Sequence, residues 1–178
     1  MDNFSGVIVT SRLKLIPATV ALARAEINDR SEFARLLEAT VPDNWPPESL
    51  ADALPLLLGW LEAAPDHVGW FGWYALAVGD DFATPRLVGS GGFLGPPTSG
   101  TVEIGYSVLP QFQRQGYANE MVGGLVGWAL RWPGVVRVGA ETEWDNRASV
   151  RVLTKVGFHP SGLPKVPNGL RFEYPTVA

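Results

Sequence analysis

The stretch that decides the fold lies at residues 108–120 and reads Val108-Leu109-Pro110-Gln111-Phe112-Gln113-Arg114-Gln115-Gly116-Tyr117-Ala118-Asn119-Glu120. Residues before Pro110 alternate as in a strand, and residues after Gly116 repeat at helical spacing, so a strand leads directly into a helix. Free N–H groups at a helix start bind anions, and Gly116 lets the main chain approach a phosphate without an intervening Cβ. Arg114 adds a positive charge. The alternative is an ordinary tight turn that holds no ligand.

Upstream of this stretch the chain changes from helical to extended patterns. An extended opening segment ends near Pro17, and the composition that follows, rich in Ala, Leu, Glu and Arg, indicates helices. One or two helices are expected within residues 18–39 and another at 48–63, where Pro55 kinks the helix or ends its first turn. Three antiparallel strands are then expected at 71–78, 86–94 and 101–109, with turns at 79–81 and 95–97.

Downstream, strands and helices alternate. Pro133-Gly134 ends the helix, and a strand at 135–140, a helix at 146–156, a strand from Phe158 and a final strand at 170–174 follow. This order predicts a parallel strand pair joined by the helix at 116–130. With 178 residues and no linker or repeat, we expect a single domain at 1–178 of the α/β (α+β) class, with a mixed, mostly antiparallel sheet flanked by helices.

The composition excludes several kinds of site. The chain has no cysteine and two histidines, which rules out disulfides, a cysteine nucleophile, and thiolate or three-histidine metal sites; we expect no metal. A net charge of −4 argues against binding to nucleic acid or an anionic membrane. The first residues lack a basic signal region, and the longest apolar run, at 54–61, is too short to span a membrane, so we expect a cytoplasmic protein.

Several blocks of residues together resemble one known family. Gln113-x-x-Gly116-x-Ala118, after a strand that ends at Pro110, is similar to the acyl-CoA loop of the GNAT superfamily of N-acetyltransferases. Residues 146–149 (Asn-Arg-Ala-Ser) and 152–158 (Val-Leu-Thr-Lys-Val-Gly-Phe) resemble a block of the branch that includes the ribosomal-protein N-terminal acetyltransferases. Residues 10–15 and 103–106 also fit that branch. The order and spacing of these pieces make the resemblance specific.

The resemblance implies that the parallel strands splay apart and that the pantetheine arm of acetyl-CoA lies in the gap. It places the pyrophosphate on the backbone N–H groups of the loop, the pantetheine beside the strand end and Asn146, and the sulfur near Ser149. The residues expected to hold CoA are Val108, Leu109, Gln113, Arg114, Gln115, Gly116, Tyr117, Ala118, Asn146 and Ser149. The implied activity is transfer of an acetyl group to a primary amine by direct attack in a ternary complex.

Such a transfer requires a neutral amine and a proton for the departing thiolate. Glu103 is the first candidate for the base, directly or through a water, and its alternative role is a charge that binds the acceptor. Glu141 and Glu143 are alternative bases. Ser149, one helical turn after Asn146, is the candidate proton donor. Tyr106 is another possible donor. However, side chains alternate along a strand, so Tyr106 lies on the face opposite Glu103, which predicts a buried core residue.

The acceptor is left open by the sequence: a protein N-terminus, a lysine or a small amine. We expect Glu141 and Trp144 to contact it, and a cluster of four carboxylates, Glu103, Glu141, Glu143 and Asp145, to suit a cation. Some ribosomal-protein acetyltransferases carry a carboxylate shortly before an Asn-Gly turn, where this chain has Lys165. The alternative function is a CoA-binding sensor without turnover. A homodimer is a further expectation.

Overall fold

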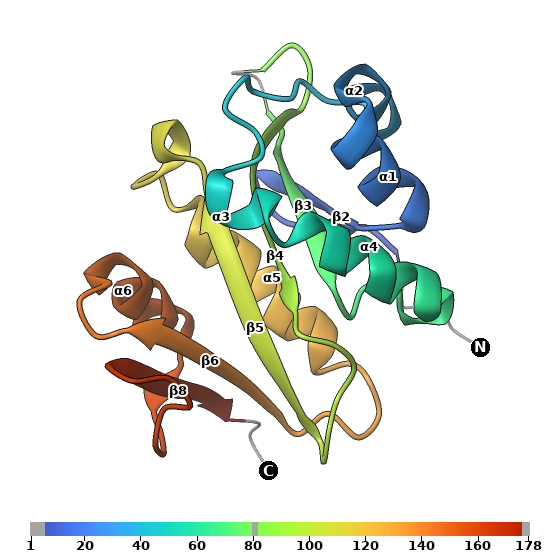
Figure 1. Ribbon diagram of the computed structural model, residues 1–178. Helices are drawn as coiled ribbons and strands as arrows, with labels where there is room; N and C mark the ends of the chain where they lie inside the picture. The colour runs from blue at the N-terminus through green and yellow to red at the C-terminus, as the bar shows by residue number, and fades with distance from the viewer. Residues whose placement is uncertain (1–5, 80–81, 176–178) are drawn as a thin grey trace.

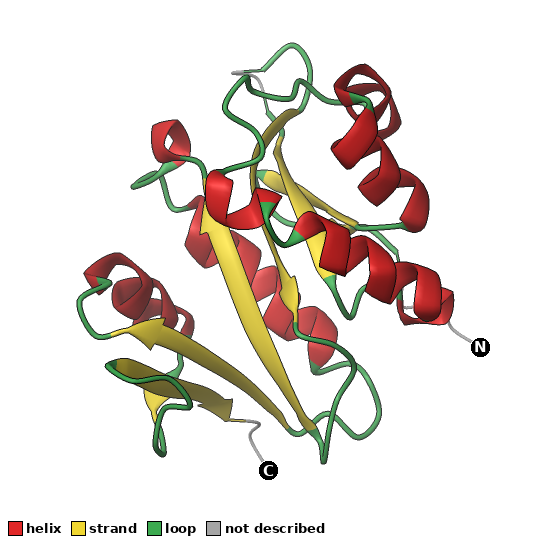
Figure 2. Cartoon of the chain, in the orientation of Figure 1, coloured by secondary structure: helices red, strands yellow, loops and turns green. Residues whose placement is uncertain are grey.

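The computed structural model describes residues 6–79 and 82–175, which form one eight-stranded sheet with helices on both faces (Figure 1 and Figure 2). The strand order is β1-β2-β3-β4-β5-β6-β8-β7, and every neighbouring pair is antiparallel except β5 and β6. The strands are Ile8–Val9 (β1), Leu13–Pro17 (β2), Gly72–Ala77 (β3), Arg86–Phe93 (β4), Thr101–Val108 (β5), Arg137–Glu143 (β6), His159–Pro160 (β7) and Gly169–Pro175 (β8). The predicted mixed, mostly antiparallel sheet is confirmed. Residues 80 and 81 of one predicted turn lie outside the described residues.

The helices begin and end where local signals place them. They are Val20–Asn28 (α1), Arg30–Leu37 (α2), Glu48–Ala51 (α3), Leu54–Ala63 (α4), Tyr117–Ala129 (α5) and Arg147–Val156 (α6). Asp29 separates the first two, because its side chain accepts the N–H groups of Ser31 and Glu32 and so caps α2. The single helix expected at 48–63 is instead two, α3 and α4, and Pro55 lies in the first turn of α4, where its missing N–H removes no hydrogen bond.

Helices α4 and α5 cover opposite faces of the sheet. A Cβ on Gly72 of β3 would contact Leu57 of α4, whereas one on Gly91 of β4 would contact Leu125 of α5. Side chains alternate along a strand, so Ser90 and Gly92 face α4. In Figure 1, α5 runs behind β4 and β5, and α4 lies in front of β3.

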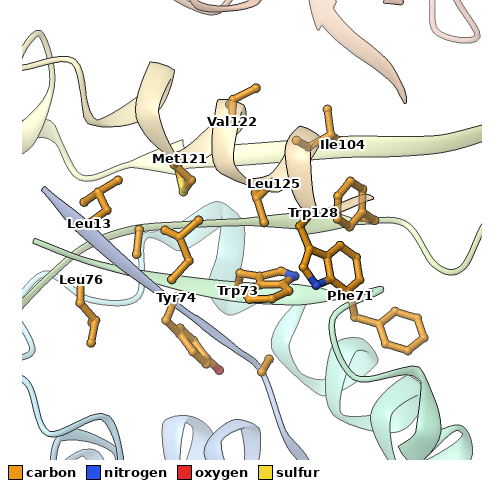
Figure 3. Close-up of a cluster of buried hydrophobic side chains, with 14 of the residues drawn as sticks. Leu13, Phe71, Trp73, Tyr74, Leu76, Ile104, Met121, Val122, Leu125 and Trp128 are labelled. Carbon is orange, nitrogen blue, oxygen red and sulfur yellow. The ribbon is translucent and has the colours of Figure 1, made fainter. Parts of the chain in front are cut away.

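The core lies chiefly between α5 and the central strands (Figure 3). Trp73 of β3 and Trp128 of α5 are fully buried and meet edge to face, with ring centroids 5.2 Å apart. Tyr74, the next residue along β3, points away from α5 in Figure 3. Trp45 and Trp70 are buried as well, whereas Trp60 and Trp144 are exposed.

The parallel pair β5–β6 opens toward the carboxyl ends of its strands. The two strands are paired from Thr101 with Arg137 to Ile104 with Ala140. Beyond that point β5 continues to Val108 beside β4, and β6 continues to Glu143 beside β8. Figure 1 shows the two strands diverging below α6. The sheet thus has a gap at its centre, and the strand ends and the N-termini of α5 and α6 surround it.

Candidate active site

The connection between β5 and α5 forms a cradle of free backbone N–H groups. Gly116 caps α5 in the left-handed conformation (φ 89°), and Arg114 is also left-handed (φ 60°). Among the described residues, the N–H groups of residues 114–119 donate to no protein acceptor. They lie at the positive end of a 13-residue helix. Such a run of donors is a site for a pyrophosphate.

The hairpin between β1 and β2 clamps this cradle. Glu120 Oε1 accepts the Thr10 hydroxyl and the Arg12 N–H, both at 2.6 Å, and Oε2 accepts the Arg12 guanidinium at 3.0 Å. Arg12 also donates to the carbonyl of Gln115 (2.9 Å) and lies over the Tyr117 ring. Burial raises the pKa of Glu120, but the hydrogen bonds from Thr10 and Arg12 outweigh it and leave that pKa below its usual value. The loop is therefore anchored to an ionised carboxylate.

A cleft of about 630 Å³ extends from the cradle, between α5 and α6, to the end of β5. Most residues expected to hold CoA line it, namely Val108, Gln113, Arg114, Gly116, Tyr117, Ala118, Asn146 and Ser149. Leu109 and Gln115 do not line it. Leu109 is 2% exposed and packs in the core, and the Gln115 side chain donates to the carbonyl of Gln111. These two residues shape the loop instead.

Two hydroxyl groups meet in the cleft. The Oη of Tyr106 lies 2.8 Å from the Oγ of Ser149 and 3.2 Å from the Ser149 carbonyl. Tyr106 is half-buried and packs against the core, so the expectation of a buried core residue holds only in part: its hydroxyl end lies in the cleft. Burial raises the pKa of Tyr106, and the hydrogen bond with Ser149 partly offsets this, so the phenol is protonated at neutral pH.

Asn146 is the cap of α6. Its Oδ1 accepts the N–H of Ser149 at 3.0 Å, which fixes the first turn of the helix and the position of Ser149. The Asn146 side chain also lines the cleft. A structural cap and a contact to a ligand are therefore compatible for this residue.

Glu103 belongs to an ion cluster across the parallel pair. Arg171 of β8 donates to its two oxygens at 2.7 and 3.2 Å, and Lys165 Nζ lies 3.3 Å away. Arg171 also donates to Glu141 at 3.2 Å. These side chains meet over Gly139 of β6, where an added Cβ would lie 2.8 Å from Glu103 and Arg171. Both oxygens of Glu103 are therefore already engaged by cations.

The predicted cluster of four carboxylates is only half formed. Glu103 and Glu141 share Arg171, but Glu143 and Asp145 are exposed beyond the end of this ion cluster. Trp144 is 63% exposed and, like them, lines neither the cleft nor the second cavity described below. These three side chains stand at the end of β6 and in the turn after it, and all are exposed.

A second cavity of about 340 Å³ lies on the other face of the sheet, beneath α3 and α4. We call it the acceptor-face cavity. Its walls are mostly apolar and include Leu54, Leu57, Trp60 and Phe71, and its floor includes Ser90, Gly92 and Gly105. Tyr106 and Ser107 line both this cavity and the cleft. Both spaces therefore border the end of β5, and Ser149 lines the cleft on one side of it.

Glu26 of α1 is the carboxylate that lines the acceptor-face cavity, and the sequence did not reveal it. Tyr74 donates to its Oε2 (2.6 Å) and Trp45 Nε1 donates to its Oε1 (2.8 Å). Among the described residues it forms no ion pair. Burial raises the pKa of Glu26 to about 6, and the two hydrogen bonds only partly oppose that rise. Nothing in its helical neighbours Ala25 and Ile27 marks this position as unusual.

This raised pKa predicts that Glu26 destabilises the fold at neutral pH. Its pKa is higher in the folded than in the unfolded chain, so the destabilisation is complete above pH 6 and disappears as the pH falls toward 4.5. Glu26→Gln keeps both hydrogen bonds, because the Tyr74 hydroxyl can also accept. We expect the variant to gain about 2 kcal/mol in urea unfolding near pH 7 and almost nothing near pH 4. Glu62→Gln, on exposed α4, is the control; an equal gain for Glu26→Gln at both pH values would contradict the prediction.

Two features are absent from the part of the chain that is described, a metal site and a membrane-spanning helix. No group of three or more His, Cys, Asp or Glu side chains is placed to hold a metal ion. Among residues 6–79 and 82–175, no helix is both long and apolar enough to cross a membrane.

Comparison with known proteins agrees with this geometry. Residues 12–159 match the family model described as acetyltransferase (GNAT) domain. The uncharacterized N-acetyltransferase YjdG of Bacillus subtilis (strain 168) is 30% identical over 150 residues, which cover 84% of this chain and 87% of the relative. Mycobacterium smegmatis RimJ in complex with CoA-disulfide has a TM-score of 0.62 at 20% identity, over 94% of this chain and 85% of that chain. The ribosomal-protein-S5-alanine acetyltransferase of Vibrio fischeri also has a TM-score of 0.62, at 16% identity and 96% coverage of both chains. The chain belongs to the GNAT acetyltransferase family.

Proposed function

We propose that this acetyltransferase moves an acetyl group from acetyl-CoA to a primary amine by direct attack in a ternary complex. The observation that carries the proposal is that two spaces, one on each face of the sheet, share Tyr106 and Ser107 at the end of β5. The cleft with the N–H cradle suits a pyrophosphate and a pantetheine arm, and the acceptor-face cavity opens at the same point from the other side. A thioester and an amine bound in these spaces would meet beside Tyr106 and Ser107, with no covalent enzyme intermediate.

The residues that hold the donor follow from the cleft. The N–H groups from Arg114 to Ala118 would bind the pyrophosphate, Val108 and Asn146 would contact the pantetheine, and the free edge of β5 at the splay offers main-chain groups for further pairing. Acetyl-CoA, when bound, supplies the activated acetyl group. The pair of Tyr106 and Ser149 would donate the proton that the departing sulfur requires.

For Glu103, the ion cluster favours the second of its two expected roles, a charge that positions the acceptor. Its oxygens are engaged by Arg171 and Lys165, so proton abstraction would require that these contacts open. Glu103→Gln should therefore lower kcat/KM on the order of tenfold, and the loss should be uniform across neutral and alkaline pH. A loss that shrinks at alkaline pH, where the amine arrives neutral, would instead identify Glu103 as the base. Glu143→Gln, an exposed carboxylate on the same face, is the control.

The proposed function is tested by thiol release from acetyl-CoA across a panel of small primary amines, lysine-containing peptides and peptides with free N-termini. Release that depends on an acceptor, with acetylated product detected by mass, supports an N-acetyltransferase. A protein that binds CoA tightly but releases no thiol with any acceptor is the CoA-binding sensor, the alternative function. The paired hydroxyls of Tyr106 and Ser149, which could supply the proton for the departing thiolate, favour the enzyme over the sensor.

A further inference from the structure

The acceptor-face cavity has one charged group and otherwise little that is polar. Its apolar wall includes the stacked rings of Trp60 and Phe71, whose centroids lie 5.7 Å apart. The wall continues outward as exposed apolar side chains at its mouth, Leu56, Trp60 and Leu94, which are 54%, 38% and 73% exposed. The volume of about 340 Å³ is at the small end for ligand sites, so it fits a small molecule or a few residues of a peptide.

Glu26 lies at the end of this cavity that is remote from the splay. It contacts Tyr74 on β3, and the register places Tyr74 beside Ser90 of β4 and Ser90 beside Ser107 of β5. Two strand spacings, about 10 Å, therefore separate Tyr74 from Ser107, where the cavity meets the cleft. The hydrogen bond to Tyr74 thus holds Glu26 on the β3 side of the cavity, two strands from Ser107.

The two neutral donors on Glu26 leave its negative charge without a cationic partner among the described residues. A partly buried carboxylate of this kind binds a cation by a charge-assisted hydrogen bond, and it repels an acceptor that ends in an anion. Because Tyr74 and Trp45 hold both of its oxygens, the carboxylate is fixed in orientation before any ligand binds.

We infer that the acceptor is an amine with an apolar body and a second, cationic group that pairs with Glu26 while the reacting amine lies at the end of β5. This inference names the substrate class of the site under Proposed function, and so rests on that function. The reacting amine lies at Ser107 and Tyr106, and the apolar body lies against the leucines of α4 and the ring of Phe71. Two sources have this chemistry: a free diamine, or a peptide N-terminus followed by apolar residues and a lysine.

The inference is tested by calorimetric binding in the presence of CoA, with octylamine and octamethylenediamine as the probes. We expect the wild-type protein to bind the diamine on the order of tenfold more tightly, after allowance for its two equivalent amines. In Glu26→Gln this preference should fall to near unity, and in the control Glu62→Gln, which lies on α4 and pairs with Arg24, it should persist. A tripeptide amide with lysine or norleucine at its third position, compared in the same way, distinguishes the peptide source from the free diamine.

Three results would overturn the inference: equal affinity of the wild-type protein for both probes in each pair, no measurable binding of any of them, or a preference that survives Glu26→Gln. Each is separable from failure of the proposed function. Thiol release with some other amine would preserve the acetyltransferase while removing this substrate class. Conversely, a diamine preference that depends on Glu26, without thiol release, would preserve the binding site and refute the reaction.

Discussion

Gly116→Glu should weaken CoA binding on the order of 10²- to 10³-fold while leaving the protein folded. Gly116 lies at the centre of the free N–H groups, and a carboxylate there would compete with the pyrophosphate for the same donors and repel its charge. The added Cβ begins at the mouth of the cradle, 3.1 Å from the Arg12 guanidinium. Calorimetric titration with CoA measures the effect directly, independent of any acceptor.

Two control variants separate charge from strain in this experiment. Gly116→Ala places a side chain at the same positive φ without a charge, so its smaller loss of affinity measures backbone strain alone. Gly123→Glu introduces the same charge on the exposed side of α5, where an added Cβ contacts nothing within 4 Å. CoA affinity in Gly116→Glu equal to that in Gly123→Glu would show that the pyrophosphate binds elsewhere.

The elements of this fold were predictable because their signals are local. The change of periodicity at Pro110 and Gly116 predicted the strand–helix connection, and the order of strands and helices predicted the parallel pair. The ends of elements were less predictable. The sixth strand was expected at 135–140 but runs from Arg137 to Glu143, because its polar end, Thr142 and Glu143, pairs with Leu170 and Gly169 of β8. Such pairing depends on a distant segment, which periodicity does not report.

The candidate site was also predictable only in part: its backbone features were, and its charge pairs and buried groups were not. The cradle is a backbone feature signalled by a glycine before a helix, so its place could be predicted, although the Gln113 N–H donates to Pro110 and neither Leu109 nor Gln115 lines the cleft. The pair of Glu103 and Arg171 was not, because it forms across Gly139 between strands that are far apart in the sequence. Glu26 was missed for a related reason: its burial arises only when Tyr74 and Trp45 pack around it. Charge partners and burial are properties of the assembled sheet.

Tyr106 shows how the splay changes the interpretation of a strand pattern. Parity correctly placed it on the face opposite Glu103 and Ser107, but in a continuous sheet that face would bury it. Because β6 diverges after Ala140, the hydroxyl of Tyr106 extends into the cleft and meets Ser149 of α6. A residue that parity assigns to the core thus becomes a candidate acid.

Tyr106→Phe should lower kcat on the order of 10- to 100-fold with little change in the KM for acetyl-CoA, because the proton is required only as the thiolate departs. Ser149→Ala should have an effect of similar size. The two hydroxyls lie 2.8 Å apart and act as one donor, so the double variant should lose little more than either single variant. Thr154→Ala, which removes an exposed hydroxyl from the same helix, is the control.

The pH dependence identifies which hydroxyl gives up the proton. Burial raises the pKa of Tyr106 above its usual value, so the wild-type protein should keep its acid, and its kcat, at alkaline pH values where an exposed phenol would begin to ionise. If Tyr106 is the donor and Ser149 only orients it, Ser149→Ala should shift the alkaline limb upward, because the hydrogen bond from Ser149 is what lowers that pKa. If the alkaline limb of the kcat profile is unchanged in Ser149→Ala and Tyr106→Phe keeps full activity, the proton comes from Ser149 alone. Additive losses in the double variant would show that the two hydroxyls serve separate steps.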